Sequence, residues 1–596
     1  MPIYKAPTTD MMFILKDVLQ IENYSNIPSF EEVSYDLVEA VLSEGAKVAE
    51  EVYQPLNQVG DEVGCTRHED GSVTTPPGFK EGFDTFRNGG WMGLTMPPEY
   101  GGQGLPYIMA VPINEMVDSA NHSLAMYPGL TMGASTLIAN AGTDEMKQKY
   151  LPKMITGEWT GTMNLTEPHC GTDLGQLKSK AELQDDGTYK ITGTKIFISA
   201  GEHDMSENII HPVLARLPGA PDGVRGISLF IVPKFLVNDD GSLGERNAVT
   251  CGSIEHKMGI HGNVTAVMNY DGATGYMIGE ENRGLIAMFI MVNAARLGVS
   301  LQGMAQSEVS YQNAVEYAKD RLQGRSLTGV KNPDGPADPI IVHPDVRRML
   351  LEGKAFNEGA RMMAYWAALN VDISRKSPDE AERQKSNDLL ELLTPVMKGF
   401  FTEMGYKCAT QHQQVFGGHG YIKEWGMEQF VRDARITMMY EGANGIQALD
   451  LVARKLPKEG GRGIRTYFAE LEAFIKEHEG GAADEFVQAL KKGVSDLQQA
   501  TMWLMENATK NPDEAGAASM SYMFIMGYVT LGHMWAKMAV ASHAALAAGT
   551  DNPDFHNTKI KTGRFYITRM MPETSMHLDK LKTGAETLMD LDADQF

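Results

Sequence analysis

The sequence predicts an α+β protein that is mainly α-helical, with helices first, then a small β domain, then helices again. Apolar residues recur at helical spacing up to about residue 158, and again from residue 280 onward. Between them lie short β-rich runs separated by Gly, Asn and Asp. With 596 residues and 43% hydrophobic content, the chain can bury several cores, so we expect four domains: 1–158, 159–279, 280–458 and 459–596.

The first two domains differ in the period of their apolar residues. In the N-terminal domain, Val33, Leu37 and Val41 mark one amphipathic helix face, and residues 96–104 form a Gly- and Pro-rich turn cluster. The clearest strands of the β domain are expected at 189–199, 226–232 and 264–270. Pro212 conflicts with a central strand, so we expect it at a sheet edge, at a bulge or where a strand ends.

The third and fourth domains read as helices. A long periodic helix covers Ala295–Arg321, and residues 331–344 form a polar loop. Thr394–Pro395 has the pattern of a helix start, and Gly417–Gly418 that of the same helix's end. In the fourth domain, the apolar stretch Ala517–Ala548 could span a membrane, but its histidines, lysine and glycines favour a buried packing helix.

Composition excludes several classes of function. The net charge of −24 argues against nucleic-acid binding and, more weakly, against anionic membranes. The four cysteines are far apart without a CxxC pair, so we expect neither a disulfide framework nor a metal site. The N-terminus lacks the apolar run of a secretory signal, and we expect a cytoplasmic protein without membrane insertion.

The most informative segment is Met438–Gln447, which places the carboxylate of Glu441 beside a glycine at the end of an apolar stretch. Such a carboxylate is either a paired structural charge or a base kept partly dry so that its pKa rises toward neutrality. Taken alone, the segment favours the structural interpretation. Its order and spacing after Gln414–Tyr421 and Val431–Ile436, however, resemble the C-terminal signature of the flavin-dependent acyl-CoA dehydrogenases.

This resemblance covers roughly residues 35–455 and implies that Glu441 is the catalytic base. Arg296 resembles an arginine near the base, and it would contribute to catalysis and to substrate binding together with Gly442. One branch of the family carries its base just before that arginine, where this chain has Ala295, so Glu441 is the candidate left. Ala443 and Gly445 depart from the family pattern.

Further motifs resemble the family's FAD contacts. Residues 163–173 resemble the loop whose hydroxyl and main chain face the flavin, and residues 197–201 resemble a segment that lies against the flavin ring. Residues 317–325 resemble the segment that contacts the FAD pyrophosphate, and residues 414–418 the part that approaches the ADP half, usually from the partner subunit. The implied FAD-binding residues are Thr166, Thr172, Phe197, Ser199, Arg321, Gln323, Gln414, Gly417 and Gly418.

The resemblance implies that Glu441 takes the α-proton of an acyl-CoA while the β-hydride passes to FAD. An electron-transfer flavoprotein would be the acceptor, and a homodimer the assembly. Residues 1–7, 417–425 and 440–451 resemble the branch that oxidises 3-methylmercaptopropionyl-CoA in dimethylsulfoniopropionate breakdown. The alternatives are a short- or medium-chain acyl-CoA dehydrogenase of fatty-acid oxidation, an acyl-CoA oxidase, and a non-enzymatic flavin- or CoA-binding scaffold.

Overall fold

The computed structural model describes residues 2–596 and divides the chain into two compact units. One unit consists of Glu44–Gly298, and the other combines the described residues up to Ser43 with Val299–Phe596. The predicted α+β class, mainly α with one β domain between helical parts of the chain, is confirmed. The division into four domains remains a prediction.

The helices of the 44–298 unit come mostly before its strands. Two of them begin at side-chain caps, because Asn121 accepts a hydrogen bond from the N–H of Leu124 and Thr143 from that of Met146. The helices are α3 (Gln54–Val63), α4 (Phe79–Asn88), α5 (Ala110–Ala120), α6 (His122–Ala141) and α7 (Asp144–Ile155), together with the end of α2 (Tyr35–Lys47) and the start of α8 (Gly284–Asp320).

A seven-stranded sheet forms the β domain of this unit. Its path runs β10-β11-β5-β4-β6-β3, with β7 pairing both β6 and β11. The strands are β3 (Trp159–Gly161), β4 (Lys180–Leu183), β5 (Tyr189–Ser199), β6 (Asn208–Arg216), β7 (Ile227–Pro233), β10 (Val249–Ile254) and β11 (Thr265–Met277); β1 (Thr66–Arg67) with β2 (Val73–Thr74), and β8 (Phe235–Val237) with β9 (Leu243–Arg246), form separate pairs. The three predicted strands are confirmed, although β11 runs on well beyond residue 270.

The prediction for Pro212 is wrong. Pro212 lies in the middle of β6, which has neighbours on both sides, and its pairing with Ile231 of β7 continues without a bulge. Its carbonyl accepts the N–H of Asn164, so its ring nitrogen faces the same side, where β3 has already ended at Gly161. On that side the regular pairing of β6 stops at Ile210 and resumes with β4 only at Arg216, apart from the single bridge between Asn164 and Val213, so a proline is tolerated there.

The core of this unit lies between the sheet and helices α6, α7 and the first part of α8. Trp159 of β3 and Leu214 of β6 are fully buried, and Tyr150 of α7 and Met291 of α8 pack into the same cluster. Helices therefore cover one face of the sheet, and the loops that follow β3 and β5 are held from a rigid base.

A histidine–aspartate pair in this unit makes its stability depend on pH. His261 Nδ1 lies 3.0 Å from a carboxylate oxygen of Asp61, and this hydrogen bond, opposed by burial, raises the pKa of His261 to about 9. Because the folded pKa is raised, the stabilisation is complete below the ordinary value of 6.5 and is lost as the pH rises through about 9. We expect His261→Gln to destabilise the protein at pH 6 and to have little effect at pH 10, measured by urea unfolding at both pH values.

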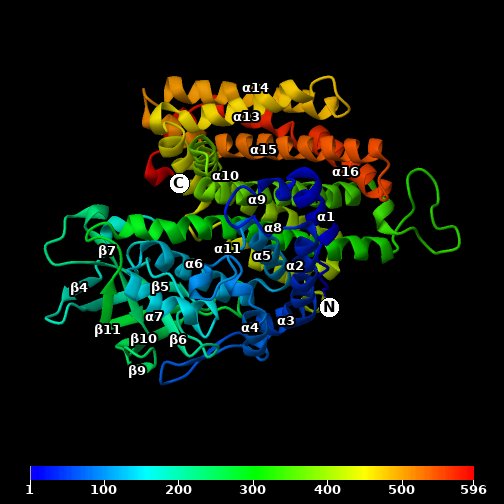
Figure 1. The fold of residues 1–596 in the computed structure, drawn as a ribbon. Helices are drawn as coiled ribbons and strands as arrows, with labels where there is room; N and C mark the ends of the chain where they lie inside the picture. Colours follow the sequence, from blue (N-terminus) through cyan, green and yellow to red (C-terminus); the bar gives the residue numbers. More distant parts are fainter. Residues whose placement is uncertain (1) are drawn as a thin grey trace. The chain divides into compact units, whose positions relative to one another are not determined.

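The other unit is built almost entirely of helices. In Figure 1, α15 lies between α14 and the pair α9–α10, and it contacts each of these three helices. The helices are α1 (Thr8–Phe13), α9 (Pro344–Lys376), α10 (Glu380–Val415), α11 (Met427–Ile436), α12 (Asn444–Asp450), α13 (Arg462–His478), α14 (Asp484–Asn507), α15 (Pro512–Ala548), α16 (Pro553–Phe565), α17 (Glu573–Lys582) and α18 (Glu586–Met589), with the later part of α8.

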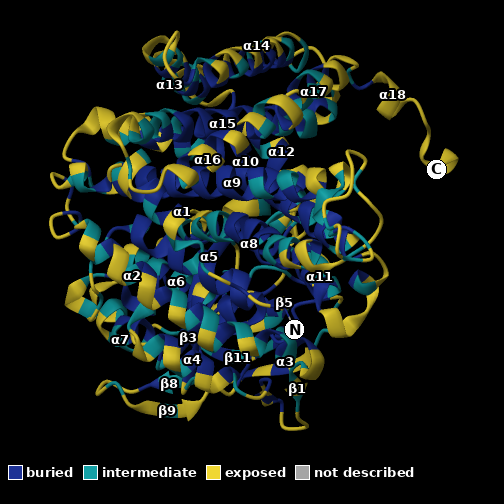
Figure 2. Ribbon diagram, turned by 90° about the vertical axis from the view of Figure 1, so that its right-hand side faces the viewer, coloured by how far each residue is buried: buried dark blue, intermediate teal, exposed yellow. Residues whose placement is uncertain are grey.

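The apolar stretch Ala517–Ala548 forms α15, and its central residues are buried (Figure 2), so the predicted packing helix is confirmed. Among the described helices, α8 is the one long and apolar enough to cross a membrane, judged by length and composition alone. Core helices of soluble proteins pass the same test.

The predicted helix start at Thr394–Pro395 is also wrong. Helix α10 begins at Glu380, where Asp379 caps the N–H of Ala381, and continues through Pro395 to Val415. Pro395 has no N–H to donate to the carbonyl of Glu391. The hydroxyl of Thr394 donates to the carbonyl of Leu390. Burial of both faces of α10 outweighs this local cost, which a local sequence signal cannot register. The predicted end at Gly417–Gly418 is confirmed.

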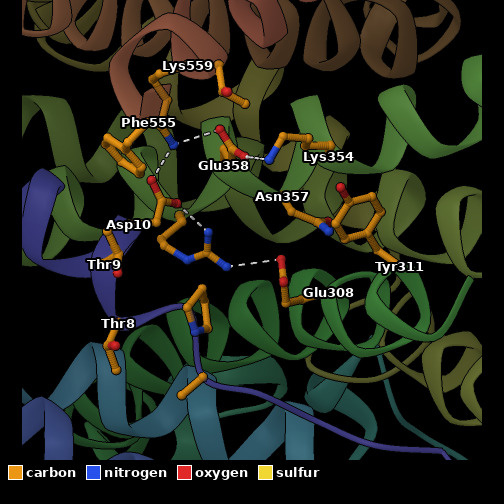
Figure 3. A pocket seen from close by; sticks show the side chains of 14 residues that line it. Thr8, Thr9, Asp10, Glu308, Tyr311, Lys354, Asn357, Glu358, Phe555 and Lys559 are labelled. Atoms are coloured by element: carbon orange, nitrogen blue, oxygen red, sulfur yellow. Dashed lines mark hydrogen bonds and ion pairs between the residues drawn. The ribbon is translucent and has the colours of Figure 1, made fainter. Parts of the chain in front are cut away.

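A buried network of alternating charges joins distant parts of the chain in this unit (Figure 3). Arg361 of α9 bonds Asp10 of α1 at 2.6 Å and Glu308 of α8 at 3.1 Å. Lys559 of α16 bonds Glu358 of α9 at 2.7 Å and also Asp10. The six members, in order, are Glu308, Arg361, Asp10, Lys559, Glu358 and Lys354.

These side chains border a cavity of about 250 Å³, which includes none of the predicted site residues. Burial alone would raise the pKa of Asp10, but Lys559 and Arg361 outweigh burial and hold it below its ordinary value. Charges of opposite sign face one another throughout, so the network offers no net charge to a ligand, and removing one member would leave an unpaired buried charge.

Candidate active site

Glu441 lies in the turn between α11 and α12 and has a left-handed backbone, with φ of 56°. Gly442 follows with φ of 86°, a conformation that favours glycine. A non-glycine residue in this region is strained, and such strain persists only where the surroundings impose it, commonly at functional sites. The side chain is half-buried, as a partly dry base requires.

Neighbouring side chains hold this turn on both sides. The hydroxyl of Tyr440 donates to the amide oxygen of Gln302 on α8. The amide of Gln447 on α12 donates to the carbonyl of Glu441 at 2.9 Å and to that of Gly442 at 3.3 Å. The strained backbone is therefore fixed from α8 and from α12, and the direction of the Glu441 side chain is set by packed helices.

The turn after α10 leaves room for a close approach to the backbone. Gly417 has φ of 58°, and a Cβ added at Gly417 or Gly418 would meet no atom within 4 Å. Gln414 is exposed in the last turn of the helix. Because none of the described residues occupies this space, the glycines fit a ligand that approaches the main chain.

Arg321 lies at the C-terminal end of α8, and aromatic stacking brings that helix end to the glycine turn. The ring of Tyr317 stacks on Phe416 with centroids 4.1 Å apart, and its hydroxyl donates to the Phe416 carbonyl at 3.3 Å. Arg321 and Gln323 are both exposed. Arg321 thus follows, one helical turn along the chain, the residue that contacts the glycine turn, and an exposed guanidinium at a helix end suits a phosphate group.

Thr166 and Thr172 lie in the loop between β3 and β4 of the other unit, and a buried ion pair anchors this loop. Lys195 of β5 is fully buried, and its ammonium bonds Glu167 at 2.9 Å and the carbonyl of Leu165 at 3.0 Å. Burial lowers the pKa of Lys195 to about 8, although Glu167 opposes the shift. Thr166 is therefore presented from a rigid support, half-buried, while Thr172 is exposed.

Phe197 and Ser199 occupy the end of β5. The Phe197 backbone is left-handed, with φ of 60°, and 58% of the residue is exposed. An aromatic side chain that is both strained and exposed is unusual, because burial is what normally stabilises it. The arrangement fits a planar ligand stacked on the ring.

Glu167, His169 and Cys170 bring potential metal ligands within 4.8 Å of one another. The Glu167 carboxylate, however, accepts hydrogen bonds from Lys195, from the Ser179 hydroxyl and from two backbone N–H groups. His169 Nε2 lies 2.9 Å from the carbonyl of Gln176. These side chains already serve the structure of the loop.

The predicted site residues fall into two sets, one in each compact unit. The unit that contains Glu441 also contains Gly442, Arg321, Gln323, Gln414, Gly417 and Gly418. The 44–298 unit contains Thr166, Thr172, Phe197, Ser199 and Arg296, the last of these half-buried on α8. Within each unit the structure places motif residues on shared elements, and the joining of the two sets into one site remains a prediction.

Sequence reasoning missed the residues that support the motifs. These are Lys195, Tyr317, Gln302 and Lys398, which bond the flavin loop, the glycine turn and the turn of Glu441. Lys398 is the one lysine in the mostly apolar segment Val396–Phe401, and a charged residue among apolar neighbours in a helix is a usable signal. Gln302 and Tyr317 carry no such signal, because polar residues on a long helix are common.

Comparisons with known proteins cover almost the whole chain. Family models match as Acyl-CoA dehydrogenase N-terminal domain over residues 64–158, middle domain over 162–273 and C-terminal domain over 282–456. Residues 467–592 match Acetyl-CoA dehydrogenase C-terminal like. A 3-methylmercaptopropionyl-CoA dehydrogenase of Ruegeria pomeroyi is 42% identical over 589 residues, 98% of this chain and 99% of the relative. This chain belongs to the acyl-CoA dehydrogenase family.

Two further comparisons extend the match. A butyryl-CoA dehydrogenase of Syntrophomonas wolfei is 34% identical to this dehydrogenase, with 100% of this chain and 99% of the relative covered. The solved structure of Caenorhabditis elegans ACDH-11 in complex with C11-CoA has the same fold, with a TM-score of 0.79 at 17% identity, covering 99% of this chain and 96% of that one.

Membership of the family confirms the predicted enzyme class. The dehydrogenase is an oxidoreductase that acts on CH–CH bonds, and FAD is its cofactor, as the sequence predicts. The C-terminal helical part of the chain matches a family model of its own over residues 467–592, so the predicted extra C-terminal domain is confirmed.

Proposed function

We propose that this dehydrogenase oxidises the Cα–Cβ bond of a short acyl-CoA thioester, with 3-methylmercaptopropionyl-CoA as substrate and methylthioacryloyl-CoA as product. The strained, half-buried Glu441 carries the proposal for the reaction. The relative named for this substrate, 42% identical over nearly the whole chain, supports the acyl group.

Glu441 is proposed as the base that takes the α-proton of the thioester. An exposed carboxylate has a pKa of about 4.3 and is too weak a base, so the site must exclude water to raise it. The backbone N–H of Glu441 is proposed to donate to the thioester carbonyl, where negative charge develops as the proton leaves. Gly442 and Arg296 are proposed to contact the substrate. FAD, when bound, supplies the acceptor for the β-hydride.

The residues present fit FAD. Phe197 offers an exposed aromatic face, and the hydroxyls of Thr166 and Ser199 are proposed as donors beside it, with Thr172 in the same loop. Arg321 suits the pyrophosphate, and the open space at Gly417 and Gly418 suits the ADP half, with Gln414 and Gln323 nearby in sequence. The exposed strained ring and the vacant backbone turn are both features that a bound cofactor would explain.

Membership of the acyl-CoA dehydrogenase family is also the basis for proposing the assembly and the electron acceptor. We propose a homodimer in which the Arg321 segment and the glycine turn of one copy complete the FAD site of the other. The reduced cofactor would pass electrons to an electron-transfer flavoprotein in the cytoplasm. No nucleic-acid partner is expected, given the net charge of −24.

The test is anaerobic bleaching of the visible flavin band by a panel of acyl-CoAs. Fastest bleaching by 3-methylmercaptopropionyl-CoA, compared with butyryl-, octanoyl- and palmitoyl-CoA, is the expected result. Faster bleaching by butyryl-CoA would keep the reaction and overturn the substrate. A protein that holds FAD but is reduced by none of the four would overturn both. Peroxide formation at the turnover rate in air would identify an oxidase.

Butyryl-CoA is the second candidate substrate, because a relative named butyryl-CoA dehydrogenase is 34% identical over the full chain. The two acyl groups have similar length and differ by a thioether sulfur in the chain. An apolar pocket discriminates such differences by only about 10- to 200-fold, so full rate curves for both substrates are needed.

A further inference from the structure

A buried lysine on α10 contacts the turn that carries Glu441. Lys398 is fully buried, and its ammonium donates to the carbonyl of Gly442 at 2.8 Å and to the side-chain oxygen of Asn444 at 2.9 Å. All of these residues belong to one compact unit. The ammonium therefore lies one peptide unit from the proposed base.

Asn444 extends this contact into a network. Its amide nitrogen donates to the hydroxyl of Thr402 at 3.0 Å and to the carboxylate of Glu403 at 3.0 Å, both on α10. Asn444 is itself the first residue of α12. Lys398 and Asn444 thus fasten the end of the turn to α10, while Gln447 and Tyr440 hold the remaining parts.

The position is a costly one for a lysine. Removing an ammonium from water is unfavourable, and an apolar side chain of similar length would fill the same space without that cost. A lysine is therefore useful here for the hydrogen bonds that it makes. The Gly442 carbonyl and the Asn444 side-chain oxygen, which accept from it, both lie in the three residues that follow Glu441.

The backbone geometry explains why the contact matters. Consecutive left-handed residues, φ of 56° at Glu441 and 86° at Gly442, form a conformation that the chain adopts only when held. The direction of the Gly442 carbonyl fixes the orientation of its peptide plane, and the Gln447 amide fixes that of the preceding one. These two planes flank the Cα of Gly442, and the first of them along the chain also contains the Cα of Glu441, so the contacts hold the main chain on the C-terminal side of the base.

We propose that Lys398 is a positioning residue for Glu441, which holds the Gly442 carbonyl and so keeps the base aimed at the substrate α-carbon. This inference rests on the proposed function. The ammonium of Lys398 also favours the charged form of the nearby Glu441 carboxylate. Removing this ammonium is therefore expected to raise the pH at which the reaction reaches half its maximal rate.

The test compares Lys398→Met, Lys398→Gln and Lys398→Arg with the wild-type holoenzyme. Anaerobic flavin reduction at saturating acyl-CoA is measured against pH, and binding of the enoyl-CoA product is titrated through the flavin spectrum. Displacing a reacting group by about 1 Å costs on the order of 100-fold in rate, so Lys398→Met is expected to lose about that factor. Enoyl-CoA affinity is expected to change far less, and Lys398→Arg to recover part of the rate.

A readout independent of turnover is hydrogen exchange of the peptide covering residues 438–447, which is expected to speed up in Lys398→Met. Lys407→Met, an exposed lysine on the same helix, is the matched control and is expected to leave exchange and rate unchanged. If Lys398→Met fails to fold, Lys398→Gln and Asn444→Ser carry the test.

The outcomes separate the two proposals. A folded Lys398 variant with wild-type reduction rate, pH profile and exchange would overturn the positioning role while leaving the proposed reaction standing. A wild-type enzyme that no acyl-CoA reduces would overturn the proposed function and this inference with it. An equal loss of rate and of enoyl-CoA affinity would indicate a collapsed site and would also contradict a positioning role.

Discussion

Glu441→Gln is expected to lower the rate of flavin reduction by acyl-CoA by about 10⁴-fold, at the upper end of what a general base contributes. Glutamine has nearly the same shape as glutamate but cannot take a proton. The turn is held by Tyr440, which bonds Gln302, by Gln447, which bonds the main-chain carbonyl of Glu441, and by Lys398, which bonds the carbonyl of Gly442, and the substitution leaves these three bonds in place. FAD content and melting temperature should therefore remain those of the wild type.

Stopped-flow reduction under anaerobic conditions measures this effect, with Glu424→Gln, an exposed glutamate, as the control. A Glu441→Gln enzyme that keeps more than a tenth of the wild-type rate would show that another group takes the proton. Loss of bound FAD in the variant would instead show that Glu441 is a paired structural charge. Residues 438–447 favour this interpretation when they are considered without the other motifs.

Arg361→Met is expected to destabilise the protein by about 3–5 kcal/mol, because it leaves buried carboxylates without their cation. Arg361 is 1% exposed and bonds both Asp10 and Glu308. Glu308 loses the cation that it faces, and Asp10 keeps only Lys559. Denaturant unfolding followed by helix content measures the loss.

Two variants sharpen this test. Adding Asp10→Asn to Arg361→Met removes one of the stranded charges and is expected to recover part of the stability. Arg454→Met removes an exposed arginine whose ion pair with Asp450 is long, at 3.7 Å, and is expected to cost less than about 1 kcal/mol. Equal losses of unfolding free energy for Arg361→Met and Arg454→Met would contradict the inference that burial makes the charges left by Arg361 costly.

The same network predicts sensitivity to acid. Because the pKa of Asp10 is held below its ordinary value of 3.8, the stabilisation is present above that value and is lost as the pH falls through the lower, folded pKa. The wild type should therefore lose stability more steeply below pH 4 than the Asp10→Asn variant does.

The sequence predicted those features that depend on local pattern. Strand β5 was placed at its observed bounds and α15 was recognised as a packing helix, because alternation and apolar runs are properties of neighbouring residues. Pro212 and Pro395 were misplaced for the opposite reason. Each proline costs a hydrogen bond locally, and the compensation comes from a missing strand neighbour in one case and from helix burial in the other.

The candidate site divides in the same way. The motif residues could be assigned because their order along the chain resembles a known family, whereas the side chains that orient them could not. Lys398 reaches Gly442 across 44 residues, and Lys195 reaches Glu167 across 28. Pairings of this kind depend on which helix or strand packs beside which, and no local signal in one sequence contains that information.

The charge network has a consequence for the order in which the protein is made. Residues 44–298 form one uninterrupted compact unit, which can fold while the rest of the chain is still being synthesised. The other unit cannot, since Asp10 bonds Lys559, 549 residues later. At a translation rate of about 5–20 residues per second, Asp10 waits roughly half a minute to two minutes for that partner. Arg361 is made earlier, but the N-terminal segment must remain without Lys559 during this interval, so helix α16 completes a structure that α1 began.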